Sequence, residues 1–260
     1  MLKLLLTCEH GGNNIPKAYQ TYFQGHRDVL NSHEGYDIGA LDLFNELEDV
    51  GDVCFYSETS RLLVELNRSL HHKKLFSDFT KNLADKEKNE ILKHYYYPYR
   101  NKVEQMVHDL VMAGRRVLHI SVHSFTPILN GEERKADIGL LYDPKRKGEQ
   151  AISREWREEM LRLDSNLLIR NNYPYLGIAD GLPTYLRKIF NEKEYIGVEL
   201  EVNQKFPEGD QEQWEALKST IRQALSQVLQ KYRTDEEPQE FCQKINLKYH
   251  NITKSSNNKY

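Results

Sequence analysis

The sequence is poor in the features that mark secreted, membrane-embedded and nucleic-acid-binding proteins. It has three cysteines in 260 residues, Cys8, Cys54 and Cys242, and their unpaired spacing indicates reduced thiols and a cytoplasmic location. No stretch approaches the roughly 18 consecutive apolar residues of a membrane-spanning helix. The apolar run Leu4–Leu6 near the N-terminus is too short for a signal peptide. The net charge is only −3, so we expect neither nucleic acid nor a membrane as a partner.

Apolar segments typical of buried strands alternate with segments of helical periodicity. This pattern predicts an α/β fold: a single three-layer domain whose mixed, largely parallel central sheet has helices on both faces. The length fits one such domain, which we expect over residues 1–233, followed by a flexible polar tail over 234–260. Strands are predicted over 2–7, 52–56, 116–122, 137–142, 167–170 and 195–202. Helices are predicted over 39–49, 86–112 with an interruption near Pro98, 149–163, 184–190 and 211–232.

Polar clusters stand at the ends of several predicted strands. They lie at residues 8–13, 65–68, 123–124, and at 199 and 201 within the last strand. In open α/β sheets, ligands bind at the carboxyl ends of the strands. These clusters therefore indicate one functional site at that edge of the sheet.

His10 and His123 each come directly after an apolar strand. Neutral imidazole is the commonest protein ligand for zinc, and catalytic zinc usually takes three protein ligands and a water molecule. One histidine in such a place is more often structural, whereas two at equivalent strand ends with carboxylates nearby fit a metal site and a structural role equally well. His119 lies inside its strand, where a packed, hydrogen-bonded role is the better interpretation.

Glu199 and Glu201 lie on one face of the last strand, because alternate residues of a strand share a face. A carboxylate among apolar strand residues suits a general base, although a structural pairing with an arginine is the alternative. The pattern does not choose between the two glutamates. Asn67-Arg68 offers an amide and a guanidinium for a substrate carboxylate, and a turn with a surface arginine is the alternative here.

Seven segments in order resemble the N-formylglutamate amidohydrolase family. They are LLTCEHGGNNIP (5–16), HEGYDIGA (33–40), SRLLVELNRS (60–69), VHSFTP (122–127), ADIGLLYDP (136–144), NNYPYLGIADG (171–181) and GVELE (197–201). The family is similar in core architecture to zinc carboxypeptidases and aspartoacylases. The resemblance implies that His123 binds zinc, that Asn67 and Arg68 bind a substrate carboxylate, and that Glu199 rather than Glu201 is the general base.

Two positions depart from the pattern that the resemblance implies. The relatives' first metal motif is His-x-x-Glu, but Asn13 stands three residues after His10. The third metal ligand is then Asn13, Glu9 or Asp37, and we favour Asp37 because YDIGA resembles a family feature and carboxylates bind zinc. Glu201 stands where the family more often carries arginine, which predicts a change of substrate.

The implied activity is zinc-dependent hydrolysis of the amide bond of a small acidic N-acyl amino acid, such as N-formylglutamate in histidine catabolism. Arg61 would stabilise the oxyanion, and the loop 172–181, with Tyr175, would form a lid or a substrate pocket. The alternatives are a zinc peptidase or amidase that acts on peptides or cell-wall fragments, and a catalytically silent ligand-binding relative.

Overall fold

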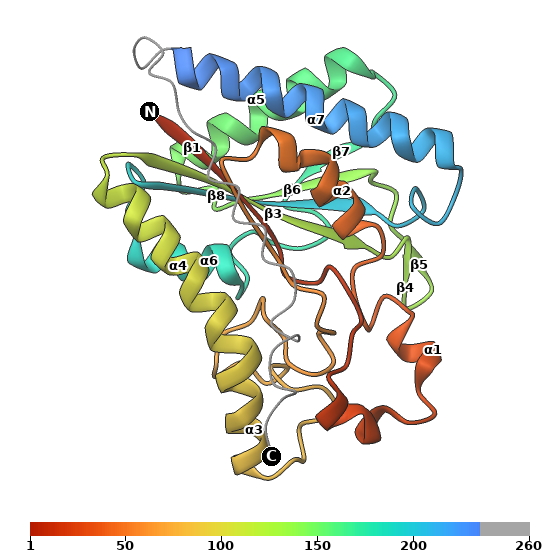
Figure 1. Cartoon of the computed structure of the whole chain (residues 1–260). Coiled ribbons are helices and arrows are strands. Elements are labelled where there is room, and N and C mark those ends of the chain that lie inside the picture. The colour runs from red at the N-terminus through yellow and green to blue at the C-terminus, as the bar shows by residue number, and fades with distance from the viewer. Residues whose placement is uncertain (235–260) are drawn as a thin grey trace.

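A six-stranded sheet forms the centre of the protein (Figure 1). The computed structural model describes residues 1–234, so the predicted polar tail beyond residue 234 lies outside the described residues. The sheet has the order β2-β1-β3-β8-β6-β7. Its neighbouring strands are parallel except for β6 and β8, which are antiparallel. The predicted mixed, largely parallel sheet is therefore confirmed. The strands are Leu2–Cys8 (β1), Val53–Tyr56 (β2), Arg116–Phe125 (β3), Ile138–Leu141 (β6), Ile169–Asn171 (β7) and Tyr195–Asn203 (β8).

Helices cover both faces of this sheet, as the alternation of strands and helices predicts. In Figure 1, α2, α5 and α7 lie over one face, and α4 and α6 lie under the other. The α-helices are Arg27–Leu30 (α1), Ala40–Leu47 (α2), Asp85–Ile91 (α3), Tyr97–Met112 (α4), Lys147–Leu163 (α5), Leu182–Ile189 (α6) and Gln211–Thr234 (α7). Shorter turns of 3-10 helix occupy Lys17–Phe23 and Glu48–Val50.

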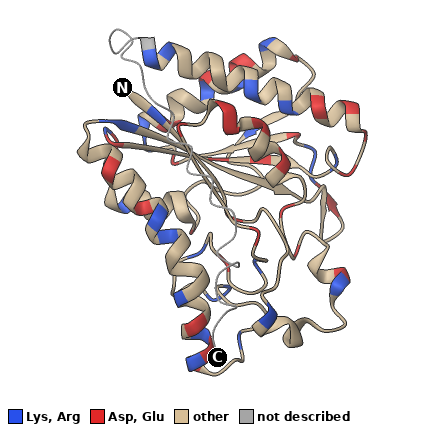
Figure 2. Ribbon diagram, viewed as in Figure 1, with Lys and Arg blue, Asp and Glu red and all other residues tan. Residues whose placement is uncertain are grey.

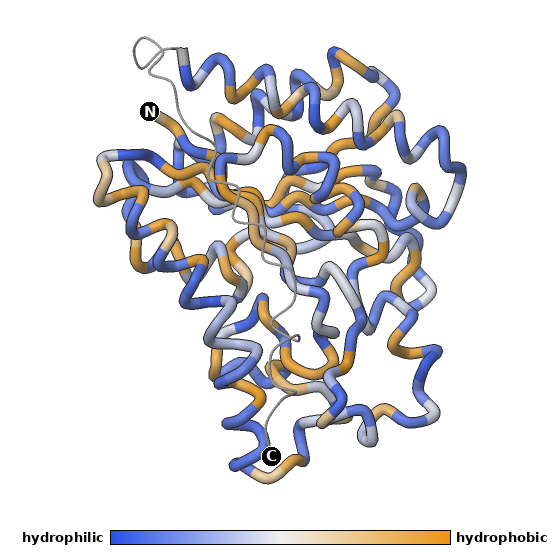
Figure 3. The backbone as a smooth tube through the Cα atoms, in the orientation of Figure 1, coloured by the Kyte–Doolittle hydropathy of each residue, from blue (hydrophilic) through white to orange (hydrophobic). Residues whose placement is uncertain are grey.

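The two faces of the sheet differ in polarity, and this difference positions the site. Alternate residues of β1, β3 and β8, such as Leu6, Ile120 and Val198, pack under α2, α5 and α7 in one large apolar cluster. Figure 3 shows the hydrophobic segments gathered in these central strands. On the opposite face, one buried apolar residue from each of β1, β2, β3 and β8 packs against α4 and α6. The carboxyl ends of β3 and β8 carry polar side chains there.

A smaller lobe covers this polar end of the sheet. It has its own apolar cluster, formed mainly by residues 62–66, Leu75, Ile91 and Tyr96. The Tyr96 hydroxyl donates to the carbonyl of Arg68 at 2.7 Å, and the Arg100 guanidinium donates to the carbonyl of Leu66 at 3.2 Å. These bonds fix the segment that carries Glu65, Asn67 and Arg68 beside the strand ends.

The predicted interruption of the helix over 86–112 is confirmed. A π-helical turn at Leu92–Tyr96 precedes α4, and Pro98 lies in the first turn of α4, where a missing N–H is tolerated. Strand β3 continues three residues further than predicted because it pairs with β8 as far as Phe125 and Asn203. The sequence analysis also missed a short hairpin of β4 (Ile128–Leu129) and β5 (Glu132–Glu133).

Charges of both signs are interspersed along the outer helices (Figure 2). Ion pairs such as Lys218–Asp42 at 2.8 Å join α7 to α2. Among residues 1–234, no helix is both long and apolar enough to cross a lipid bilayer. Cys8 is fully buried and Cys54 is partly buried, and both thiols are free. Burial raises the pKa of Cys54 to about 12, which fits a packing role. Cys242 lies outside the described residues.

Candidate metal centre

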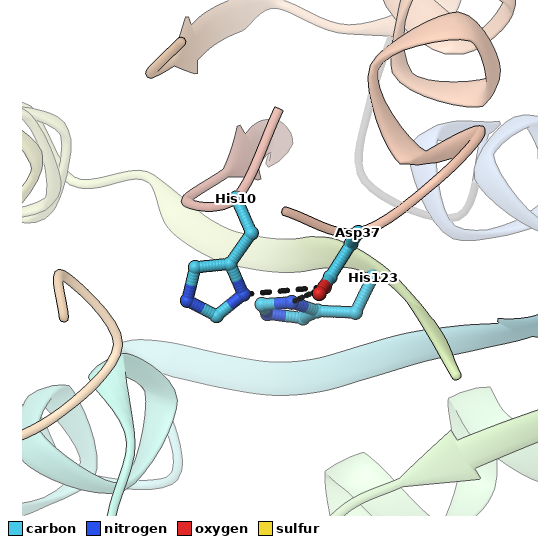
Figure 4. A group of neighbouring side chains, drawn as sticks. All are labelled: His10, Asp37 and His123. Carbon is cyan, nitrogen blue, oxygen red and sulfur yellow. Dashed lines mark hydrogen bonds and ion pairs between the residues drawn. The ribbon is translucent and has the colours of Figure 1, made fainter. Parts of the chain in front are cut away.

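His10, Asp37 and His123 converge at the carboxyl end of the sheet (Figure 4). The Nδ1 atom of His10 lies 3.2 Å from Asp37 Oδ2, and the Nδ1 atom of His123 lies 2.9 Å from the same oxygen. The three ligand atoms all lie within 4.8 Å of one another, and all three residues are buried. The structure thus brings the two predicted histidines together with the favoured third ligand.

Each member of this group comes from a different part of the fold. His10 follows β1 by two residues, whereas His123 lies within β3 rather than after it. Asp37 lies in the loop before α2, and its backbone N–H donates to the carbonyl of His10 at 3.0 Å. Ser60 secures the same loop, because its hydroxyl donates to the carbonyl of Gly35 at 2.8 Å. A backbone contact therefore sets the position of Asp37.

The second nitrogen of each histidine faces a buried carboxylate. His10 Nε2 bonds Glu65 Oε1, and His123 Nε2 lies 3.1 Å from Glu9 Oε2. Glu9 is held in turn by the hydroxyls of Ser121 at 2.6 Å and Tyr99 at 3.0 Å. In protein metal sites, a ligating histidine almost always donates its other N–H to such an outer partner. The sequence analysis placed Glu9 and Glu65 in polar clusters but did not predict that each would face the second nitrogen of a histidine.

The charges in the cluster hold one another in their ionised forms. Burial alone would raise the pKa of Asp37, but His10 and the Arg61 guanidinium hold it well below its usual range. Burial would likewise raise the pKa of Glu65, and Arg61 and His10 reverse that effect. For His123, burial would lower the pKa, yet the hydrogen bonds to Asp37 and Glu9 raise it well above its ordinary value.

The donor set of this cluster fits a divalent metal such as zinc. Zinc lies about 2.0–2.1 Å from imidazole nitrogen and carboxylate oxygen, so tetrahedral ligand atoms are about 3.3–3.4 Å apart. The observed separations of 3.2 and 2.9 Å between the Nδ1 atoms and Asp37 Oδ2 are close to this spacing. Two imidazoles and one carboxylate would also leave a coordination position for water, as catalytic sites require.

The other two candidates for the third ligand lie elsewhere. The side-chain amide of Asn13 donates to the carbonyl of Leu30 at 3.1 Å and to Asn31 Oδ1 at 2.8 Å. Glu9 lies on the Nε2 side of His123, whereas the three donor atoms meet on its Nδ1 side. Among the three candidates, only Asp37 belongs to the convergent group.

Arg61 borders the cluster and bridges two of its carboxylates. Its Nη1 donates to Asp37 Oδ1 at 2.9 Å, and its Nε and Nη2 donate to Glu65 Oε2 at 2.9 and 2.6 Å. Burial would lower the pKa of Arg61, but Glu65 and Asp37 raise it. Since a guanidinium has five N–H donors, two of them make no hydrogen bond to residues 1–234.

Glu199 is connected to the cluster through Asn67. The amide nitrogen of Asn67 lies 3.1 Å from Glu199 Oε1 and 3.3 Å from His123 Nε2, and its Oδ1 accepts from the Leu182 N–H at 2.6 Å. In the part of the chain that the structure describes, Glu199 is therefore held by an amide and not by an arginine. Asn67, predicted to bind substrate, makes all of these contacts within the protein.

Glu201 differs from the other carboxylates of the site. Its residue is only 6% exposed, and its carboxyl group makes no hydrogen bond to any residue in the described part of the chain. Its Oε2 atom is fully buried without a partner. Burial raises the pKa of Glu201 to about 8, with the charges of Asp37 and Glu199 acting in the same direction.

The loop 172–181 lies next to these residues. Its carboxyl-terminal end is joined to the 65–69 segment, where the Nη1 atom of Arg68 bonds the Asp180 carbonyl and the Ser69 N–H donates to Asp180 Oδ2 at 2.9 Å. Tyr175 is 46% exposed, and its hydroxyl accepts from Arg134 Nη1 at 3.2 Å.

His119, interpreted as structural, is hydrogen-bonded inside β3. Its ring nitrogens lie 2.7 Å from the hydroxyl of Thr7 and 2.7 Å from that of Tyr195. Burial lowers the pKa of His119 to about 4. The ring is therefore neutral at physiological pH, as a packed histidine is expected to be.

This fold and this cluster define the class of three-layer α/β proteins whose functional site lies at the carboxyl ends of the strands. The sequence profile of the N-formylglutamate amidohydrolase family matches residues 2–206. The chain belongs to this family, which places it among enzymes that hydrolyse amide bonds.

Comparison with solved structures finds the same fold. The gene product Atu2144 from Agrobacterium tumefaciens is 25% identical, with a TM-score of 0.72 over 89% of this chain and 92% of that chain. The N-formylglutamate amidohydrolase from Ralstonia eutropha JMP134 is 16% identical, with a TM-score of 0.64 over 90% and 95%. A metallo-carboxypeptidase from Burkholderia cenocepacia is a more distant likeness, 10% identical with a TM-score of 0.41 over 89% and 58%. No curated protein sequence matches the chain.

Proposed function

We propose that the protein is a zinc-dependent amidohydrolase that cleaves the amide bond of a small acidic N-acyl amino acid, with N-formylglutamate as the reference substrate. The observation that carries this proposal is the convergence of His10 Nδ1, His123 Nδ1 and the Asp37 carboxylate. Membership of the family supports the reaction class. Glu65 and Glu9 face the second nitrogen of His10 and of His123. These buried carboxylates support a metal site rather than a group held by hydrogen bonds alone.

His10, Asp37 and His123 would hold the metal. When bound, the metal supplies Lewis-acid chemistry, because it lowers the pKa of a water molecule and polarises a carbonyl group. Glu199 accepts one proton from the attacking water and returns it to the nitrogen of the leaving amine. The C–O bond to water forms and the C–N bond breaks, so the products are the free carboxylate and the amino acid.

The remaining residues orient the substrate and the general base. The two unbonded N–H groups of Arg61 are suited to the negative charge that develops on the carbonyl oxygen. Asn67 aligns Glu199 through the 3.1 Å hydrogen bond. Among residues 1–234, Arg68 finds hydrogen-bond partners through Nη1 alone, which leaves Nε and Nη2 for the α-carboxylate of the substrate.

Removal of the metal is expected to abolish activity. After treatment with a chelator, the release of free amine from N-formylglutamate and from other N-formyl amino acids should fall by at least about 100-fold. Added zinc should restore it. Short peptides and cell-wall fragments assayed in parallel test for a peptidase. An enzyme that retained full turnover after its metal content had fallen to zero would contradict the proposal.

Glu65 offers a test of the metal centre that does not depend on turnover. The variant Glu65→Gln replaces the charged partner of His10 Nε2 by a neutral one, and we expect zinc affinity to fall roughly 10- to 100-fold. Competition with a fluorescent zinc chelator measures this affinity. Glu132→Gln, at an exposed position in β5, is the matched control. Equal zinc affinity in both variants would remove Glu65 from the metal site.

A further inference from the structure

We infer that Glu201 forms a subsite for a nitrogen that donates hydrogen bonds, such as the ammonium or primary amide group at the end of a substrate side chain. This inference rests on the proposed hydrolysis of an N-acyl amino acid, but it replaces the side-chain carboxylate of N-formylglutamate by a group that donates hydrogen bonds. It names the chemistry of the substrate side chain, which the metal cluster and Glu199 leave undefined.

The position of Glu201 places it beside the reacting groups. Within the sheet it is paired with His123 of β3 on one side and with Gly139 of β6 on the other. Glu201 and Glu199 lie on the same face of β8, because they are two residues apart in a strand. A substrate whose amide bond lies at Glu199 and the metal cluster therefore has its other groups within reach of Glu201.

Every other carboxylate of the site has its hydrogen bonds. Glu9, Asp37, Glu65 and Glu199 each accept at least one from a side chain of the protein. Glu201 accepts none from residues 1–234, and its Oε2 atom is fully buried. An unpaired buried polar group is costly and rare in folded proteins. A hydrogen-bond donor on a bound ligand would explain why the carboxyl group of Glu201 has no partner among residues 1–234.

The surroundings decide what kind of partner fits. The charge that acts most strongly on Glu201 is that of His123, which favours the ionised carboxylate, whereas Asp37 and Glu199 act against it. Both nearby cations, His123 and Arg61, are already paired with carboxylates of the protein. A group that supplies N–H donors satisfies Glu201 without adding negative charge. A side-chain carboxylate would add negative charge and would supply no N–H donor.

The loop 172–181, rather than a side chain of β6, lies beside Glu201. The partner of Glu201 in β6 is Gly139, and a Cβ atom there would lie 1.9 Å from the carbonyl oxygen of Tyr173. Glycine is thus required for the loop 172–181 to approach the sheet, and no side chain of β6 occupies this position. The rings of Tyr173 and Phe125 meet edge to face nearby, with centroids 6.4 Å apart.

Binding of free amino acids to the zinc-loaded protein tests the subsite without requiring turnover. Isothermal titration calorimetry should show lysine and glutamine binding about 10- to 100-fold more tightly than glutamate and norleucine, the range for one hydrogen bond to a charged group. Comparison of lysine with glutamine separates the ammonium from the amide. Wild-type protein that bound glutamate as tightly as both would overturn the inference, and this result needs no variant.

The variant Glu201→Gln links the selectivity to this residue. We expect it to fold, to keep its zinc and to lose most of the preference for lysine, whereas Glu208→Gln, at an exposed turn, keeps it. An unchanged preference, or a loss of zinc that marks Glu201 as a metal ligand, would count against the subsite.

Turnover of the matching N-formyl amino acids separates the two proposals. If no N-formyl amino acid is hydrolysed while the binding preference persists, the proposed function fails and the subsite stands. If turnover depends on the metal but is equal for all substrate side chains, the proposed function stands and the subsite fails.

Discussion

Replacing Asp37 with asparagine is expected to deprive the protein of its metal and thereby of its amidase activity. Asp37 Oδ2 is the atom on which both Nδ1 atoms converge, at 3.2 and 2.9 Å. Loss of an outer partner costs roughly 10- to 100-fold in metal affinity, and loss of a direct charged ligand should cost more. We expect zinc affinity to fall by more than about 100-fold, with kcat/KM falling at least in parallel.

The asparagine variant is chosen because it preserves the shape of the site. Its amide oxygen can still accept the hydrogen bond that Arg61 Nη1 donates at 2.9 Å, so the loop before α2 should stay in place. Asp78→Asn, in which an 88% exposed carboxylate is neutralised, is the matched control. Metal analysis and thermal unfolding of both variants separate loss of zinc from loss of the fold. Wild-type zinc affinity in a folded Asp37→Asn protein would exclude Asp37 as a ligand.

The sequence was sufficient to predict the central sheet and the proximity of His10 and His123 at its carboxyl edge. Continuous apolar runs identify buried parallel strands, and β1, β3 and β8 are found where such runs predict them. Parallel strands bring their carboxyl ends to one edge, so His10 and His123 had to come close together. Alternation also predicted that Glu199 and Glu201 share a face. These inferences depend only on local periodicity and on a general rule of α/β folds.

The contacts that complete the cluster could not be predicted in this way. Asp37 reaches it through a backbone hydrogen bond to His10 across 27 residues. Only the family resemblance and the affinity of carboxylates for zinc favoured Asp37 as the third ligand. Glu65 belongs to the smaller lobe that covers the polar end of the sheet, and no periodic pattern in the sequence predicts that it lies next to His10. Such positions follow from the packing of irregular loops, which local sequence does not encode.

The hydrogen bonds of the site also refine the predicted roles. Arg61 was expected to serve the oxyanion, and the structure adds that it bridges Asp37 and Glu65. Asn67 and Arg68 were expected to bind substrate, and both also hold other parts of the site through bonds to Glu199 and Asp180. Substitution of these residues would therefore disturb the protein as well as the substrate. The two glutamates of β8 give cleaner tests.

Replacing Glu199 with glutamine is expected to lower kcat by about 10²- to 10⁴-fold, the usual contribution of general acid–base catalysis. Glutamine cannot take a proton from water, but its amide oxygen can still accept the 3.1 Å hydrogen bond from Asn67. Zinc content and the affinity for product amino acids should therefore remain close to those of the wild type. Steady-state kinetics with every substrate that the wild type hydrolyses, together with metal analysis, measures these quantities.

The comparison with Glu201→Gln makes this prediction specific. Loss of the general base lowers kcat for every substrate by a similar factor, because the proton transfer does not involve the side chain of the substrate. Loss of the proposed subsite changes the ratio of kcat/KM values between substrates, because only some side chains donate to it. If Glu199→Gln kept its kcat while Glu201→Gln lost it on all substrates, the general base would be Glu201. The unpaired carboxyl of Glu201, whose pKa burial raises to about 8, would then belong to the chemistry rather than to the selectivity.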